Sequence, residues 1–145
     1  MEPRCHEQET IVTYNVLESM RRHRVPRIVF SSSGTVYGDV GTTVTHEQLG
    51  PCLPVSLYGA GKVASEGLIS AFCGTFGLSA IIFRFGNIVG ERTTHGVIYD
   101  FIRQLAKNSA DLKVLGNGFQ AKPYVYVGDL VKGLLFGRTP APLHV

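Results

Sequence analysis

Hydrophobic residues along the chain follow two different spacings. Helical spacing over Gln8–His23, Leu57–Phe76 and Val97–Lys107 predicts a helix in each of these segments. Short apolar runs at Arg27–Ser31 and Ala80–Phe83 are typical of buried parallel strands. The alternation of helices and strands predicts an α/β fold, in which a partial Rossmann-like parallel sheet is flanked by helices.

The segment between the first strand and the second helix is rich in Gly, Thr and Pro. A long irregular loop is therefore expected over residues 34–55. Loops of this length in compact domains usually carry function, and this one is expected to cross the carboxyl edge of the sheet, where open α/β folds bind ligands. Ser56 then fits the cap of the second helix, and Gly77 fits its end.

The last third of the chain has a weaker pattern. Short strands are predicted at Leu112–Leu115 and Tyr124–Val127. Asp129 is expected to cap a final helix that ends at Phe136.

Composition narrows the function classes. The 145 residues, 44% of them hydrophobic, suit one domain. The net charge of +3 includes a cluster of arginines near the end of the first predicted helix, where cations complement the helix dipole, so no nucleic-acid partner is expected. Three cysteines without metal-ligand spacing predict no metal site and a reducing, cytoplasmic setting. No signal peptide or membrane-spanning window occurs in the sequence.

Tyr58 and Lys62 lie four residues apart, so they share one face of the second predicted helix. A phenol is a poor base at neutral pH, but a neighbouring cation favours its charged form. Tyr58 is therefore predicted to act as the acid/base and Lys62 as the residue that tunes it. A hydroxyl such as Ser33 can hold a substrate oxygen in line with the phenol, which makes Ser33 the third candidate catalytic residue.

The residues around this pair carry a family resemblance. The serine triplet Ser31–Ser33 ends an apolar strand, Val36–Gly38 follows it, Tyr58 comes 25 residues after Ser33, and Arg84–Gly90 has the form Arg-x-x-Asn-x-x-Gly. This arrangement resembles the extended short-chain dehydrogenase/reductase family, and within it the nucleotide-sugar epimerases of the UDP-glucose 4-epimerase type.

The resemblance implies an NAD-dependent epimerase that oxidises the sugar transiently at C4. It implies that Ser31, Ser32, Tyr58 and Lys62 contact the cofactor, the two serines through backbone atoms. It also implies that Ser33, Asn87 and Lys122 contact a nucleotide-sugar substrate, for which a UDP-hexose is expected. Lys122 stands where these epimerases commonly carry an arginine for the substrate phosphate, and a solvated lysine is an equal alternative.

Gly34 and Thr35 separate epimerisation from dehydration. In the related nucleotide-sugar dehydratases an Asp-Glu pair follows the hydroxyl residue and supplies an extra acid and base. Gly34 and Thr35 cannot transfer protons in that way, so the sequence favours epimerisation over dehydration or another short-chain oxidoreductase reaction.

The sequence also departs from the family pattern. No glycine-rich turn Gly-x-x-Gly-x-x-Gly for the cofactor pyrophosphate is present, so residues 1–145 are expected to form a single incomplete domain that by itself binds NAD weakly or not at all. Glu9 stands where the family often has asparagine, and Val12 where it has a small residue. The alternative is a truncated, non-catalytic paralogue that retains the helices 8–23 and 57–76, through which relatives commonly form homodimers.

Overall fold

The computed structural model describes residues 4–137, with side chains from residue 9 onward. These residues form two compact bodies, one made of the residues up to Gly86 and from Leu135 on, the other of Asn87–Leu134.

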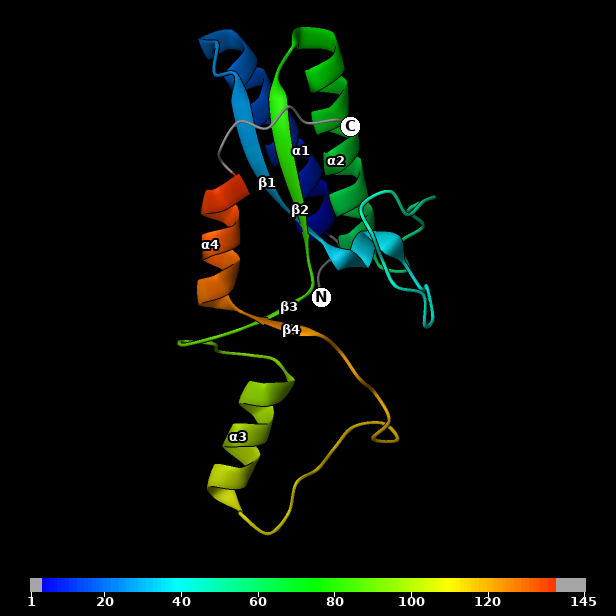
Figure 1. The fold of residues 1–145 in the computed structure, drawn as a ribbon, viewed down its shortest axis with the longest axis vertical. Coiled ribbons are helices and arrows are strands. Elements are labelled where there is room, and N and C mark those ends of the chain that lie inside the picture. The colour runs from blue at the N-terminus through cyan, green and yellow to red at the C-terminus, as the bar shows by residue number, and fades with distance from the viewer. Residues whose placement is uncertain (1–3, 138–145) are drawn as a thin grey trace. The chain divides into compact units, whose positions relative to one another are not determined.

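A two-layer arrangement of helices on a parallel strand pair forms the first body (Figure 1). Strand β1, Arg27–Ser33, pairs in parallel with β2, Ser79–Phe85, so that Ser33 lies opposite Phe85. Helices α1, Arg4–His23, and α2, Leu57–Phe76, pack on this sheet, and the 3-10 helix η1, Gly34–Tyr37, follows β1 directly. This confirms the predicted α/β fold, although both strands extend two residues further at their carboxyl ends than the apolar runs indicated.

The core of the first body lies between α1, α2 and the sheet. Leu17 and Ile69 are fully buried and Phe72 nearly so, because these helix faces meet the inward residues of the strands. The hydroxyls of Thr13 and Ser65 share a buried hydrogen bond of 3.1 Å between the two helices. The residues that pack around this core are Ile28, Phe30, Leu68, Cys73, Leu78, Ala80 and Ile82.

The ends of α2 agree with the sequence signals. The Ser56 side chain accepts a hydrogen bond of 3.0 Å from the Gly59 amide, which satisfies one of the free donors of the first turn. Gly77 ends the helix with φ of 72°, a left-handed conformation that glycine adopts without steric cost. These local signals fix where Tyr58 and Lys62 lie along the helix.

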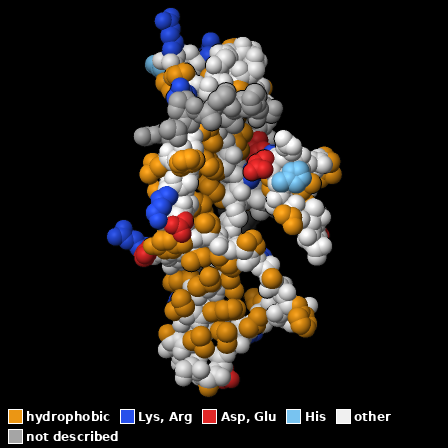
Figure 2. Space-filling view, in the orientation of Figure 1, with side chains coloured by type: hydrophobic (Ala, Val, Ile, Leu, Met, Phe, Trp, Pro, Cys, Tyr) orange, Lys and Arg blue, Asp and Glu red, His pale blue; other side chains and the backbone are white. Residues whose placement is uncertain are grey.

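The second body contains a short parallel pair, β3, Asn87–Val89, with β4, Tyr124–Tyr126. Helix α3, Val97–Lys107, lies between them in the chain, with the predicted bounds, and helix α4, Val127–Gly137, follows β4. Figure 2 shows hydrophobic side chains gathered over α3, where Val97, Ile98, Ile102 and Leu105 are exposed.

Two predictions for this body are wrong. Residues 112–115 form no strand, because no neighbouring strand supplies hydrogen-bond partners for them among the described residues. Helix α4 begins at Val127, directly after β4, so Asp129 lies inside its first turn and does not cap it.

Candidate functional site

Tyr58 and Lys62 lie on one face of α2, as their spacing predicts. The Lys62 ammonium nitrogen is 5.6 Å from the centre of the Tyr58 ring and 5.0 Å from that of Phe30. The same ammonium donates a hydrogen bond of 2.9 Å to the backbone carbonyl of Ser31, two residues before the carboxyl end of β1. The lysine therefore connects the tyrosine helix to the carboxyl end of the strand.

Lys62 has a further partner that the sequence did not predict. Its ammonium forms an ion pair with the Glu9 carboxylate of α1, and the two side chains are only 12% and 23% exposed. Of the three N–H donors of the ammonium, Glu9 and Ser31 engage two, which leaves one for a ligand. The carboxylate also offsets part of the positive charge that acts on the Tyr58 phenol.

Ser33 caps the short helix η1. Its hydroxyl oxygen accepts hydrogen bonds of 3.2 Å from the Thr35 amide and 3.0 Å from the Thr35 hydroxyl. Because a hydroxyl has one proton and two acceptor positions, these bonds occupy the acceptors and leave the Ser33 proton to donate to a ligand oxygen. Thr35 thus orients Ser33 rather than serving as an acid or base itself.

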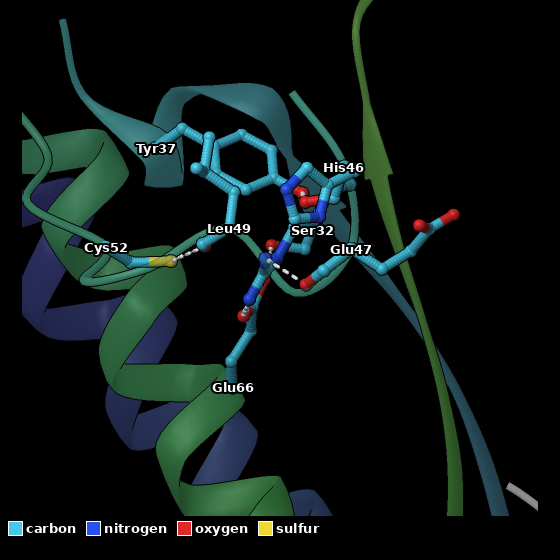
Figure 3. Close-up of polar contacts among 8 residues, drawn as sticks. Ser32, Tyr37, His46, Glu47, Leu49, Cys52 and Glu66 are labelled. Atoms are coloured by element: carbon cyan, nitrogen blue, oxygen red, sulfur yellow. Dashed lines mark hydrogen bonds and ion pairs between the residues drawn. The ribbon is translucent and has the colours of Figure 1, made fainter. Parts of the chain in front are cut away.

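The Ser32 side chain is buried, with 3% of the residue exposed, and belongs to a polar network (Figure 3). Its hydroxyl donates a hydrogen bond of 2.5 Å to Glu66, one helical turn beyond Lys62 on α2. The Glu66 carboxylate also binds the Arg84 guanidinium of β2, with contacts of 2.7 to 3.2 Å. The Ser32 side chain is therefore committed to the fold, and only its backbone remains for a cofactor.

The Arg84 guanidinium is the centre of this network. It also donates to the Glu47 carbonyl at 3.3 Å and lies 4.9 Å from the centre of the Tyr37 ring. The hydrogen bonds to Glu66 are the main cause that raises the pKa of Arg84 above its ordinary value. Arg84 is therefore a permanent cation whose charge Glu66 neutralises locally.

Asn87 and Lys122, the predicted substrate residues, line one pocket of the second body. Its volume is about 1370 Å³, and its lining includes Arg103, Lys107 and Lys113 as further cations and Asp100 as an acid. The Asn87 amide donates a hydrogen bond of 3.2 Å to the Pro123 carbonyl, beside Lys122. The excess of cations over acids suits an anionic ligand.

Two observations apply to the part of the chain that the structure describes, residues 4–137. Within that range no three His, Cys, Asp or Glu side chains form a metal-binding cluster. No helix in the described part of the chain is both long and apolar enough to cross a bilayer.

Sequence reasoning missed Glu66 and did not assign a role to Arg84 or to Glu9. Glu66 follows Lys62 by the same four-residue step that separates Lys62 from Tyr58, so the helical face itself was a usable signal. The partner of Glu66 lies 18 residues away on another element, and no local pattern identifies it.

A model of the NAD dependent epimerase/dehydratase family matches residues 3–139. A putative UDP-glucose 4-epimerase of Methanocaldococcus jannaschii is 38% identical over 128 residues, which cover 85% of this chain and 41% of the relative.

Solved structures of an epimerase and of a dehydratase are similar to this chain. A crystal structure of UDP-galactose 4-epimerase shares 42% identity at a TM-score of 0.84, over 94% of this chain and 45% of the other. An NAD dependent NDP-hexosamine 5,6-dehydratase involved in tunicamycin biosynthesis shares 26% identity at a TM-score of 0.82, over 98% and 49%. The chain thus spans less than half the length of each of these proteins.

Proposed function

The chain belongs to the NAD dependent epimerase/dehydratase family, and from this membership we propose that it provides the catalytic and substrate-binding residues of a nucleotide-sugar 4-epimerase of the UDP-glucose type. The observation that carries the proposal is the placement of Lys62 between Tyr58 and the Ser31 carbonyl at the carboxyl end of β1. The proposed base, its neighbouring cation and the carboxyl end of a strand, where α/β folds bind ligands, lie together there.

The proposed proton path uses residues of this chain. Ionised Tyr58 accepts the proton of the sugar 4-hydroxyl, while Ser33 donates a hydrogen bond to the same oxygen and holds it in line. NAD, when bound, would supply the redox chemistry at C4, as acceptor and then donor of a hydride. When the 4-hydroxyl re-forms, Tyr58 gives the proton back to the sugar oxygen.

The residues present fit one part of NAD. The third N–H of Lys62 and the backbone of Ser31 and Ser32 offer polar partners at the strand edge, where we propose that they hold the nicotinamide riboside. The sequence contains no glycine-rich turn for the pyrophosphate. We therefore propose that residues 1–145 act as a single incomplete domain, with other residues needed to hold the rest of NAD.

The basic pocket of the second body supports an anionic substrate. Lys122 and Asn87 line it together, and we propose that Lys122 contacts the diphosphate of a UDP-hexose. Nuclear magnetic resonance titration with UDP tests this: Lys122→Ala is expected to weaken binding at least fivefold. Lys132→Ala removes an exposed lysine that pairs with Asp129, and should leave it unchanged. Equal binding by wild type and Lys122→Ala would refute the assignment.

A chimaera tests the reaction. The chain replaces the matching segment of the Methanocaldococcus jannaschii relative, and interconversion of UDP-glucose and UDP-galactose is measured with NAD, the unaltered relative serving as positive control. Tyr58→Phe should slow turnover by roughly 10²–10⁴-fold, the range of general acid/base contributions. Tyr14→Phe, an exposed tyrosine of α1, should not. Full activity in Tyr58→Phe, or no turnover in a folded chimaera, would overturn the proposal.

A non-catalytic dimerising role is the second candidate. Ile11, Val12 and Val16 expose between 45% and 58% of their surface on α1, which suits burial against a second copy. Sedimentation of Val12→Lys against the loop control Val44→Lys separates the cases, because only the former should abolish a dimer.

Dehydration is not favoured by the residues that follow Ser33. The Thr35 hydroxyl is hydrogen-bonded to Ser33 and does not supply the extra acid or base that a dehydratase needs. We also propose that the protein acts in the cytoplasm.

A further inference from the structure

Within the long segment between η1 and α2, the hydrogen bonds are short-range turn contacts, such as those from the Thr43 amide to the Val40 carbonyl and from the Leu49 amide to the His46 carbonyl, both 3.0 Å. Residues 38–56 contain no helix or strand, and Gly38 and Leu53 form only an isolated bridge. Ordering such a segment costs roughly 1–2 kcal/mol per residue in backbone entropy. Contacts from elsewhere in the fold must offset that cost.

Two of those contacts come from side chains that donate to consecutive carbonyls. The Tyr37 hydroxyl donates a hydrogen bond of 2.9 Å to the His46 carbonyl, and the Arg84 guanidinium donates one of 3.3 Å to the Glu47 carbonyl. Arg84 also lies over the Tyr37 ring, so one guanidinium supports both anchors. The Nε and Nη2 atoms of Arg84 donate to the Glu66 carboxylate of α2.

The same segment lies against the first turn of α2. A Cβ atom built at Gly59 would come within 2.8 Å of the Pro54 side chain and of the Thr35 carbonyl, so the backbones approach closely there. Gly59 follows Tyr58 directly. Displacement of the segment would therefore change what surrounds the tyrosine.

We propose that Arg84 is a positioning residue, which fixes residues 38–56 against the helix turn that carries Tyr58. A planar guanidinium can hold the Glu66 carboxylate with one edge and the Glu47 carbonyl with another, whereas an ammonium has no such fork. The inference goes beyond the proposed reaction, because it needs neither cofactor nor substrate to be tested. The proposal rests on the proposed function only in one respect, namely that Tyr58 is taken to be the catalytic residue.

Hydrogen exchange of the ligand-free chain, followed by mass spectrometry of peptides, tests the proposal. In Arg84→Gln, amides of residues 43–50 are expected to exchange at least tenfold faster, while those of β1 and β2 change less than threefold. Arg84→Lys keeps the charge but loses the fork, and should stay within threefold of Arg84→Gln. Arg21→Gln breaks an exposed ion pair with Glu18 on α1 and should leave residues 43–50 unchanged.

Three results would overturn the proposal. They are unchanged exchange of residues 43–50 in Arg84→Gln, an equal increase across β1 and β2, or wild-type protection in Arg84→Lys. If Arg84→Gln does not fold, Tyr37→Phe decides, because it keeps the ring under Arg84 and removes the hydroxyl that donates to the His46 carbonyl. It should raise exchange in residues 46–49 alone, and wild-type exchange there would equally overturn the proposal.

Discussion

Replacing Glu9 by Gln tests the ion pair that joins α1 to the tyrosine helix. The change keeps the size of the side chain and removes its charge, so Lys62 retains the Ser31 carbonyl but loses its carboxylate partner. The side chains are 23% and 12% exposed, so solvent screens the pair less than a surface pair. The substitution therefore leaves a partly buried ammonium without its counter-charge, which lowers the free energy of unfolding more than the loss of a surface pair does.

The magnitude follows from two opposing effects. At an effective dielectric constant of about 20, unit charges in contact attract by roughly 4 kcal/mol, and the desolvation of both groups offsets much of this. A net loss of about 1–3 kcal/mol is expected for removal of one partner. For a domain of this size the melting temperature should fall by roughly 3–10 °C.

The assay is thermal unfolding of Glu9→Gln, followed by circular dichroism at low and high salt. The matched control is Glu18→Gln on the same helix, whose carboxylate is 21% exposed but pairs with the more exposed Arg21 and Arg22, which lower its pKa to about 2. The control should melt at nearly the wild-type temperature at high salt, whereas Glu9→Gln should not recover. A cycle with Lys62→Met should give a coupling energy of about 1–2 kcal/mol. Equal melting of Glu9→Gln and wild type, or zero coupling, would refute this reasoning.

Three further predictions concern other parts of the chain. Gly38→Ala should destabilise the fold by about 2–4 kcal/mol in urea unfolding, because φ is 76° and the new Cβ would lie 2.0 Å from the Leu53 carbonyl oxygen. Gly67→Ala is the control, because open space surrounds that position, and it should be neutral or stabilising. A larger loss of stability in Gly67→Ala than in Gly38→Ala would contradict the geometry. The hydrogen bond to Glu91 raises the pKa of Tyr126 above its ordinary value of 10. The stability that this bond contributes is therefore present below pH 10 and is lost as the pH rises through the pKa of Tyr126 in the folded protein. Glu91→Gln should move the phenolate transition, followed by ultraviolet absorbance, to lower pH, and an unmoved transition would count against the bond. Calorimetric titration of the isolated chain should show NAD binding weaker than micromolar, since no glycine-rich turn is present, and micromolar affinity would contradict this.

Much of the fold was predictable because its signals are local. The helix Leu57–Phe76 has the bounds that Ser56 and Gly77 indicated, since capping and a left-handed end depend only on neighbouring residues. The shared face of Tyr58 and Lys62 follows from the helical repeat in the same way. The strand expected at 112–115 failed because a strand requires a partner, which an apolar run does not specify.

The sequence by itself determined the alternation of helices and strands, the family resemblance and the placing of a phenol beside an ammonium. Only the tertiary structure decided which groups surround that pair. Glu9 reaches Lys62 across 53 positions and Arg84 reaches Glu47 across 37, distances over which no periodicity carries information. These contacts form because helix packing and strand register bring distant side chains together, and charges in such partly buried places must find partners.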